Sequence, residues 1–240
     1  MIRIRRLGIA GVGLIGGSFA LAARRAGVVE EVVGWGRTQA NLEVALQRGM
    51  LDRAELRPEV LAGADAVLLA TPVATLAAAA RELANAAEPG ALVFDAGSAK
   101  REIGGRARFV GCHPIAGNER SGAGNADPDL LAGAPCVLTP TATTDPSALA
   151  RVRRLWEVVG MRVVEMTPRE HDELLALLSH VPHVLAFALT ALLADTARSR
   201  PEAPALAGPS FRGATRVAVS SPEMWRDILL ANRSAVGEVL

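Results

Sequence analysis

The segment from residue 5 to residue 25 constrains the fold of this chain more than any other. Arg5 to Ala10 has the composition of a short buried strand, and Gly11-Val12-Gly13-Leu14-Ile15-Gly16 follows at once. The residues from Ser18 to Arg25 then have the pattern of a helix. A strand, a G-x-G-x-x-G turn and a helix in this order are typical of a dinucleotide-binding βαβ unit. The order predicts a Rossmann-type domain at the start of the chain.

Each glycine of this motif has its own physical task. Gly11 permits the tight turn, Gly13 lets a pyrophosphate approach the backbone, and Gly16 lets the helix pack closely against the strand. The helix N-terminus adds unpaired N–H groups and a partial positive charge for the phosphates. We therefore expect the turn to bind a nicotinamide dinucleotide through Gly11, Gly13, Leu14, Ile15 and Gly16.

The end of the second expected strand, Glu31 to Trp35, bears on the choice of cofactor. In NAD sites an acidic residue commonly stands there and binds the ribose 2′-hydroxyl. Gly36 occupies that place here, and Arg37 follows it. An arginine forms charge-assisted hydrogen bonds with a 2′-phosphate, and Thr38 could add a hydroxyl or instead cap the next helix. The sequence favours NADP over NAD, with Arg37 and Thr38 as cofactor-binding residues.

Strands and helices continue to alternate as far as residue 165. Further hydrophobic strands are expected at 66–70, 91–95, 108–111, 135–139 and 162–165, and helices are expected after residue 73 and near 147–159. Such alternation predicts an α/β fold with a parallel-rich sheet covered on both faces. Ligands bind beyond the carboxyl ends of the strands in these sheets. Four candidate residues fall at such ends: Thr71, Pro72, Ser98 and His113.

The strand signals stop at Thr167. Thr167-Pro168-Arg169-Glu170 is a capping box with proline at the first helical position, and a long apolar helix follows to about Arg198. Pro182 interrupts this helix and should kink it. Ser221-Pro222 opens another helix. The chain is therefore expected to have a dinucleotide-binding domain at 1–166 and an all-α substrate and dimerisation domain at 167–240.

Four histidines are the only ones in the 240 residues. His113 stands alone, whereas His171, His180 and His183 lie in one short segment, and such a cluster indicates either metal binding or proton chemistry. His171 falls on the opposite side of an ideal helix from His180, and convergent carboxylates or cysteines are lacking. We expect no metal, and a structural role for His171 and His180.

Composition narrows the classes of function. The net charge is +1, basic residues are scattered and only 3% of residues are aromatic, which argues against nucleic-acid binding. Cys112 and Cys136 lack metal-site spacing and fit a reduced, cytoplasmic setting. The basic residues 1–6 and the uncharged run 7–23 resemble a signal peptide, but the glycine motif explains this run better. We expect a soluble cytoplasmic protein without a membrane span.

Five segments carry a resemblance to a known family: GVGLIGGS at 11–18, DAGSAK at 95–100, GCHPIAGNERSG at 111–122, HDELLALLSHVPH at 171–183, and FRGATR with PEMWRDILLANR within 211–233. On these segments the chain is similar to the prephenate/arogenate dehydrogenase family of tyrosine biosynthesis. The resemblance implies NAD(P)-dependent oxidative decarboxylation of prephenate to 4-hydroxyphenylpyruvate. The alternative is an arogenate dehydrogenase that makes tyrosine directly.

The resemblance also implies roles for single residues. His113 would be the catalytic base that accepts the proton of the ring hydroxyl, and Ser98 would bond to that hydroxyl or to His113. Substrate would be bound by Arg216, His183, Ser179 and Glu119. One departure concerns Gly213, which stands where the family often has an acidic residue, and this puts a gating ion pair with Arg216 in doubt. The family also forms homodimers through its helical domain.

Two other classes of protein remain open from the residues. One is a different two-domain NADP dehydrogenase, such as a β-hydroxyacid dehydrogenase or an imine reductase. The hydroxyacid group uses a lysine in its helical domain, whereas Lys100 is the only lysine of this chain. The other is an NADPH-binding sensor without turnover, because the fold alone does not imply catalysis.

Overall fold

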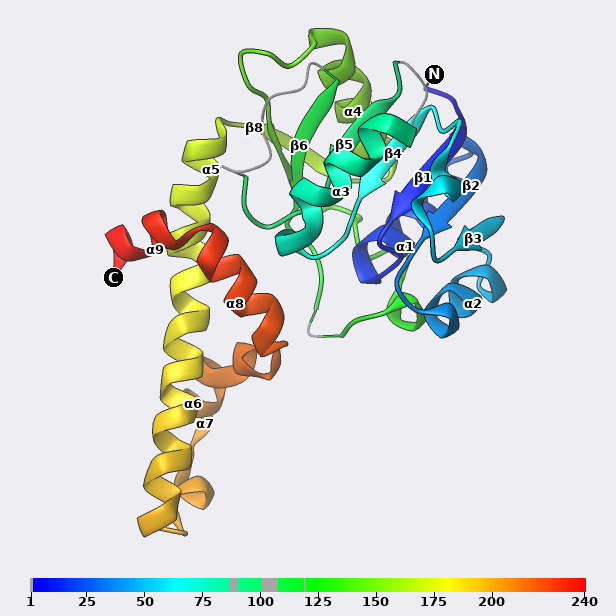
Figure 1. The fold of residues 1–240 in the computed structure, drawn as a ribbon. Helices are drawn as coiled ribbons and strands as arrows, with labels where there is room; N and C mark the ends of the chain where they lie inside the picture. The colour runs from blue at the N-terminus through cyan, green and yellow to red at the C-terminus, as the bar shows by residue number, and fades with distance from the viewer. Residues whose placement is uncertain (1, 87–89, 101–107, 119) are drawn as a thin grey trace. The chain divides into compact units, whose positions relative to one another are not determined.

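The structure is a computed structural model that describes residues 2–86, 90–100, 108–118 and 120–240 (Figure 1). The chain divides into two compact units, which are described one at a time below. Unit 1 comprises Met1–His171 and unit 2 comprises Asp172–Leu240. The expected order of an α/β part followed by a helical part is confirmed.

Unit 1 is built on a sheet whose described strands lie in the order β3-β2-β1-β4-β5-β6-β7-β8. Among these strands only the β6–β7 pair is antiparallel. The expected strands are all present, and the short strand β3 is an addition that the sequence did not predict. The bounds are β1 (Ile4–Ala10), β2 (Val29–Trp35), β3 (Arg53–Glu55), β4 (Ala66–Leu69), β5 (Leu92–Asp95), β6 (Phe109–Pro114), β7 (Pro135–Thr139) and β8 (Arg162–Glu165).

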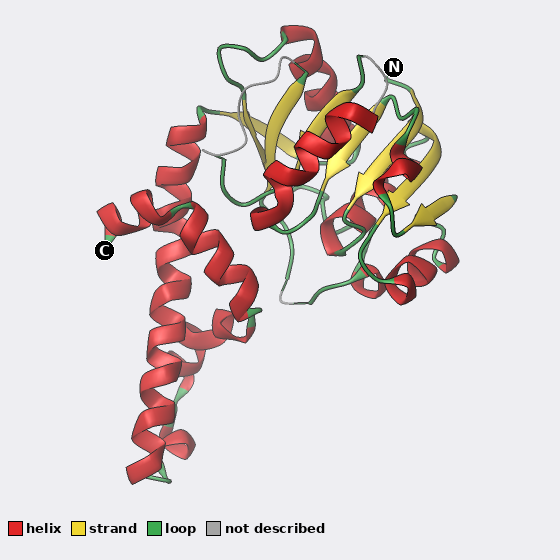
Figure 2. Ribbon diagram, viewed as in Figure 1, coloured by secondary structure: helices red, strands yellow, loops and turns green. Residues whose placement is uncertain are grey.

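Helices lie on both faces of this sheet, as Figure 2 shows. Strand β4 is buried along its whole length, and its apolar side chains point alternately to the two faces of the sheet. Both faces therefore need a cover of helices. Ala66 and Leu68 join one apolar cluster, and Val67 and Leu69 join the other. The helices of unit 1 are α1 (Leu14–Arg25), α2 (Gln39–Gln47), η1 (Pro58–Leu61), α3 (Val73–Ala86), η2 (Ala123–Asn125) and α4 (Pro146–Val158).

Three aromatic rings form the centre of the larger cluster. Phe19 of α1, Phe94 of β5 and Trp156 of α4 meet edge to face, with ring centroids 4.8 to 5.8 Å apart. This geometry is the favoured one for aromatic pairs. It fixes α1 and α4 against the strand whose end carries the candidate site residues.

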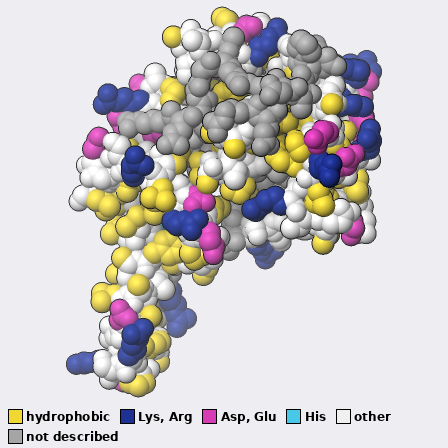
Figure 3. Space-filling model, viewed as in Figure 1, with side chains coloured by type: hydrophobic (Ala, Val, Ile, Leu, Met, Phe, Trp, Pro, Cys, Tyr) yellow, Lys and Arg dark blue, Asp and Glu magenta, His cyan; other side chains and the backbone are white. Residues whose placement is uncertain are grey.

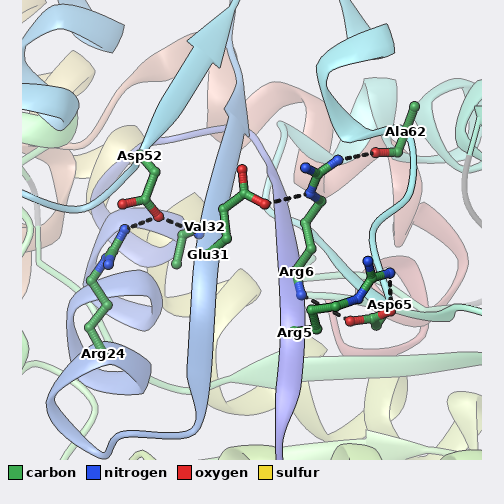
Figure 4. A network of polar contacts seen from close by, with 8 residues as sticks. All are labelled: Arg5, Arg6, Arg24, Glu31, Val32, Asp52, Ala62 and Asp65. Carbon is green, nitrogen blue, oxygen red and sulfur yellow. Dashed lines mark hydrogen bonds and ion pairs between the residues drawn. The ribbon is translucent and has the colours of Figure 1, made fainter.

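The basic residues near the N-terminus take part in a polar network along the sheet (Figure 4). Arg6 of β1 bonds to Glu31 Oε2 on β2 at 2.7 Å and to the Ala62 carbonyl at 2.9 Å. Arg5 pairs with Asp65 at 3.2 Å. Arg5 and Arg6 thus lie in strand β1 of the sheet, where the glycine motif predicted a strand.

The regular elements described in unit 2 are all helices, and its first helix begins in unit 1. Thr167 and Glu170 form the predicted capping box, because Glu170 Oε2 accepts the Thr167 N–H at 2.8 Å and Thr167 Oγ1 accepts the Glu170 N–H at 3.2 Å. Ser221 caps α8 as expected, since its Oγ accepts the Met224 N–H at 3.3 Å. The helices are α5 (Pro168–Leu175), η3 (Ala176–His180), α6 (Val181–Ser199), η4 (Ala203–Leu206), α7 (Pro209–Thr215), η5 (Arg216–Val219), α8 (Pro222–Ala231) and α9 (Arg233–Val239).

The interruption expected at Pro182 takes the form of a π-helical turn, η3, which directly precedes α6. Pro182 has no N–H to donate to the carbonyl of Leu178, which lies inside this turn. A π turn adds one residue to the local ladder and occurs often at functional sites. Two residues expected at the substrate site, Ser179 and His183, lie in and just after it.

One face of the long helix is apolar and exposed. Pro168–Ser199 is long and apolar enough to cross a membrane, a test that core helices of soluble proteins also pass. Leu185, Leu189 and Leu192 are exposed and share one face, because they are four and three residues apart. Figure 3 shows hydrophobic side chains exposed on unit 2. An exposed apolar stripe of this kind indicates an interaction surface.

Candidate active site

The glycine turn has the geometry that its spacing predicted. Gly11 has a φ of +91°, and a Cβ at this position would lie 2.5 Å from the Ala70 carbonyl oxygen and 2.7 Å from the Thr71 nitrogen. A residue with a side chain would therefore be strained and would clash with backbone. Gly16 also needs to be glycine, because a Cβ there would lie 2.3 Å from the Gly11 carbonyl oxygen.

Space is left open above the N-terminus of α1. Gly13 is the N-cap of this helix and makes no side-chain cap, and a Cβ added to it would meet nothing within 4 Å. The first turn of α1, with Leu14 and Ile15, holds no acidic residue. Uncapped N–H groups, the helix dipole and open space together fit a phosphate group.

The end of β2 differs from that of a usual NAD site. A Cβ on Gly36 would lie 2.8 Å from Leu42 Cδ2, so an acidic side chain would require Leu42 to move. Arg37 is exposed, and no hydrogen bond or ion pair joins it to another described residue. Thr38 is the N-cap of α2, yet its hydroxyl makes no capping bond. Both side chains are exposed just after this strand end.

The end of β4 carries a buried polar atom that needs a partner. Thr71 Oγ1 is buried, and among the described residues it has no hydrogen-bond partner. Its backbone nitrogen lies against Gly11 of the glycine turn, and Pro72 follows it. Unsatisfied buried hydroxyls are rare in folded proteins and indicate a missing partner such as a ligand. Thr71 thus fits a dinucleotide that lies along the turn.

A buried ion pair lies at the end of β5, and its carboxylate also bonds to β6. Asp95 and Lys100 are both buried, and Asp95 Oδ2 pairs with Lys100 Nζ. The same carboxylate accepts the Gly97 N–H at 2.9 Å and the Cys112 N–H at 2.7 Å. Ser98 and His113 each follow one of these two amides directly. One carboxylate therefore fixes the backbone beside both residues that the sequence predicted as catalytic.

His113 lies on β6 itself, one residue before its end, so the strand is longer than the expected 108–111. The extension arises because residues 111–114 pair with β7, in antiparallel orientation. His113 Nδ1 lies 2.8 Å from His171 Nε2, with the ring centroids 5.0 Å apart. His171 is fully buried near the start of α5. A direct contact between these two imidazoles was not predicted.

The loop after His113 lies against the glycine turn. A Cβ built on Gly117 would be 3.8 Å from Leu14 and 3.9 Å from Ile15. Asn41 of α2 joins the two segments as well, because its Nδ2 donates to the Val12 carbonyl at 2.7 Å and its Oδ1 accepts the Ala123 N–H at 2.8 Å. The segment of His113 is therefore next to the expected dinucleotide site. Glu119, which belongs to this loop, lies outside the described residues.

In unit 2, His183 is held by two neighbours. Its Nδ1–H donates to the Ser179 carbonyl at 2.9 Å, and its ring stacks on Trp225 with centroids 3.4 Å apart. Burial and the positive charge of Arg216 lower the pKa of His183, although the bond to Ser179 acts in the opposite direction. His183 is therefore neutral near pH 7. The unit thus brings together three of the residues expected at the substrate: Ser179, His183 and Arg216.

His180 lies in a different environment. It is buried, and its Nδ1 accepts a hydrogen bond from Asn232 Nδ2 at 3.0 Å. The same amide group donates to the Asp172 carbonyl at 2.7 Å. These bonds tie the start of α9 to the long helix, which supports the structural interpretation of His180. Among the described residues, no group of three His, Cys, Asp or Glu side chains could hold a metal ion.

Family models match both parts of the chain. Residues 19–165 match the nucleotide-binding domain of prephenate dehydrogenase, and residues 167–240 match its dimerization domain. The chain belongs to the prephenate dehydrogenase family. The resemblance deduced from the five sequence segments is thereby confirmed, and so is the fold class.

Individual members of the family agree over nearly the whole chain. A solved structure of prephenate dehydrogenase from A. aeolicus, in complex with hydroxyphenyl propionate and NAD+, is 36% identical with a TM-score of 0.91, and the match covers 99% of this chain and 86% of that one. Synechocystis arogenate dehydrogenase is 32% identical with a TM-score of 0.82, over 97% of this chain and 86% of that one. The prephenate dehydrogenase of Bacillus subtilis is 35% identical over 95% of this chain. The chain spans 64% of the length of that relative.

Two features of the site were absent from the sequence interpretation. His171 was assigned only a structural role, although it touches the expected base. Asp95 and Lys100 were not recognised as a pair, although both stand in the DAGSAK segment. The sequence signal was a lysine that follows an aspartate by five residues, at an expected strand end. Nothing in the sequence indicated the contact of His171 with His113, because 58 residues separate them.

Proposed function

We propose that this chain catalyses the NAD(P)-dependent oxidative decarboxylation of prephenate to 4-hydroxyphenylpyruvate. The observation that carries the proposal is the position of His113, on a strand whose following loop packs against the glycine turn. Membership of the prephenate dehydrogenase family supports it. A base next to a dinucleotide site is what the oxidation of a ring alcohol requires.

In the proposed reaction His113 Nε2 accepts the proton of the ring 4-hydroxyl. A bound nicotinamide would supply the acceptor for the hydride that leaves the same ring carbon. The ring becomes a dienone, which can take up an electron pair from the bond to its carboxylate. That bond breaks, carbon dioxide leaves, and the phenolate oxygen regains a proton from His113. The base thus returns to its starting state, and proton transfer of this kind contributes about 10² to 10⁴ in rate.

The remaining candidate residues are proposed to bind and orient the substrate. Ser98 would bond to the substrate hydroxyl or to His113. Arg216 would bind a carboxylate, for which the planar guanidinium is suited. Neutral His183 with Ser179 would line the pocket beside it, and Glu119 would lie near the entrance. Because prephenate carries two negative charges, its binding requires a fixed cation such as Arg216.

The proposed cofactor is NADP rather than NAD. Arg37 and Thr38 have free polar groups at the end of β2, and Gly36 leaves no acidic group for the 2′-hydroxyl. The rest of the cofactor would be held by Gly11, Gly13, Leu14, Ile15 and Gly16 together with Thr71 and Pro72. We propose that no metal takes part, because the family chemistry needs only positioning, a base and bound charge.

The domain arrangement completes the proposal. Residues 1–166 would bind the dinucleotide, and residues 167–240 would bind substrate and form a homodimer. The exposed leucine face of α6 supports the dimer, as does the match of this segment to a dimerization domain. A cytoplasmic location fits the two reduced cysteines.

The test is a steady-state comparison of prephenate and arogenate, each with NADP and NAD, on the full chain. Prephenate with NADP should reduce the cofactor fastest. Faster turnover of arogenate would support the alternative substrate, whereas silence with all four combinations would indicate a cofactor-binding protein without this activity.

His113→Asn should remove turnover, because the amide cannot accept the proton, while cofactor binding stays within about threefold of the parent chain. A fall of at least 10² in kcat is expected, the lower end of the range for such bases. Turnover retained at the parent level would remove His113 from the role of base.

A further inference from the structure

The inference concerns His171, which the proposed reaction does not use. Its Nε2 lies 2.8 Å from His113 Nδ1, within hydrogen-bond distance, and its ring is fully buried. The backbone of His171 is fixed by the first turn of α5, where its N–H donates to the Thr167 carbonyl at 3.0 Å. The capping box at Thr167 and Glu170 in turn fixes that first turn. His171 therefore presents a rigid partner to His113.

Only one hydrogen can lie between the two nitrogens when both rings are neutral. If His171 donates it, the proton of His113 sits on Nε2, and that nitrogen cannot accept another. If His113 donates it, the proton of His113 sits on Nδ1, and Nε2 keeps its lone pair. A basic Nε2 thus requires His171 to accept the bond at its own Nε2 and to carry its proton on Nδ1.

We propose that His171 is a positioning residue that accepts the Nδ1–H of His113, holds His113 in the tautomer with a basic Nε2, and stabilises the imidazolium formed when the substrate proton arrives. The inference rests on the proposed function, since it assigns His113 as the base. The logic is that of a second residue which orients and supports a catalytic histidine. The partner in this chain is a second imidazole in place of a carboxylate.

Several titratable groups lie near the two rings. Asp95 and Lys100 at the end of β5 neutralise each other. Burial raises the pKa values of Cys112 on β6 and of Cys136 on β7, which lies beside the His113 backbone, so both thiols are uncharged near pH 7. Asp172 is the next residue to His171 and is buried as well. A carboxylate bonded to Nδ1 stabilises an imidazolium more strongly than a second imidazole does.

The first test is the tautomer itself, measured by NMR on the full chain labelled with ¹⁵N-histidine. Four histidines give a spectrum simple enough to assign, with His113→Asn and His171→Asn identifying the two signals. At about pH 8, above the ordinary histidine pKa, His113 should carry its proton on Nδ1 and His171 on Nδ1 as well. A proton on Nε2 of His113 under these conditions would overturn the inference.

The second test separates this role from a structural one by kinetics. His171→Leu removes the acceptor and should lower kcat by about 10- to 100-fold, the usual loss for a supporting residue, with KM for prephenate changed less than about threefold. His171→Gln offers an amide oxygen and should restore part of the loss. His171→Asp should shift the acidic limb of the pH profile of kcat/KM upward by about one unit, because a carboxylate favours the imidazolium.

His180→Leu is the matched control, since His180 is also a buried histidine of the long helix and is hydrogen-bonded to another side chain. It should lower thermal stability and leave the pH profile unchanged. Equal pH profiles for His171→Asp, His171→Gln and the parent chain would overturn the inference. Absence of turnover by the parent chain would instead overturn the proposed function, while the tautomer measurement would still decide the pairing of the two rings.

Discussion

At the scale of single residues, the proposed cofactor site depends on glycines. Gly11, Gly13 and Gly16 are needed for three separate reasons: a left-handed φ, an open approach and a close contact with backbone. Gly36 leaves no room for an acidic side chain at the end of β2, because Leu42 fills the space that such a side chain would enter. Under the proposed function, the choice of cofactor would depend on the neighbouring Arg37.

Arg37→Ala tests this choice. The variant should weaken NADP binding by about tenfold or more, since a charge-assisted bond contributes about 1.5 to 3 kcal/mol, and should leave NAD binding nearly unchanged. Titration calorimetry with both dinucleotides gives the comparison. Arg57→Ala provides a control for loss of one exposed arginine elsewhere in the unit. An equal loss for NAD and NADP would contradict the role of Arg37 at the 2′-phosphate.

His183 predicts a pH dependence of stability. Its pKa in the folded chain is lowered, by burial first and by Arg216 in addition, so the folded state favours the neutral ring. Its contribution is therefore fully present above the unfolded value of about 6.5 and is lost as the pH falls from there through the folded value. Denaturant unfolding from pH 7 to pH 5 should show a steeper loss of stability for the parent chain than for His183→Gln. Parallel curves would contradict the lowered pKa.

At the scale of elements, the ends of β5 and β6 are joined through Asp95. Its carboxylate bonds to Lys100 and to two backbone amides, and these contacts lie next to Ser98 and His113. Buried ion pairs contribute little net stability compared with an apolar pair, but removal of one partner leaves a costly buried charge. We therefore expect the Asp95–Lys100 pair to hold the ends of β5 and β6 in position more than to add net stability.

Lys100→Met should lower the free energy of unfolding by about 3 to 5 kcal/mol, the range for a broken buried pair. Urea denaturation of the parent chain and the variant measures this. The double variant Asp95→Asn/Lys100→Met should recover part of the loss, because it leaves no uncompensated charge. A single variant as stable as the parent chain would show that the pair is not buried as described.

At the scale of the whole molecule, each unit has its own core and its own part of the chemistry. Unit 1 contains the glycine turn, Ser98 and His113, and unit 2 contains Ser179, His183 and Arg216. Unit 2 has few buried apolar side chains, of which Ala176, Ala235 and Val236 form one cluster. Its long helix exposes leucines that its own fold does not cover. In the proposed homodimer, a second copy of the chain would bury this surface.

Leu185→Glu/Leu192→Glu should convert a dimer into a monomer, because two charges on one apolar face cannot be buried without partners. Sedimentation equilibrium at micromolar concentration measures the mass. Leu206→Glu is the matched control, since Leu206 is 79% exposed on the separate helix η4, and it should remain dimeric. A monomeric parent chain, or a dimeric double variant, would contradict an interface on this face.

Much of the local structure followed from the sequence. The glycine spacing, the hydrophobic runs and the caps at Thr167 and Ser221 depend on neighbouring residues only, so they predicted the elements closely. The antiparallel pairing of β6 with β7 and the short strand β3 did not follow, because each depends on a partner distant in the chain. The π turn before Pro182 was foreseen as an interruption but not in its form.

The sequence by itself determined the family, the fold class and the residue types at the site, because these are encoded in local patterns and in motifs of fixed spacing. Only the tertiary structure decided which of those residues touch. It placed His171 against His113 across 58 residues, joined Asn41 to both the glycine turn and the loop after β6, and left Thr71 Oγ1 without a partner among the described residues. The physical reason is that a side-chain contact depends on how distant segments pack, and no local pattern records that packing.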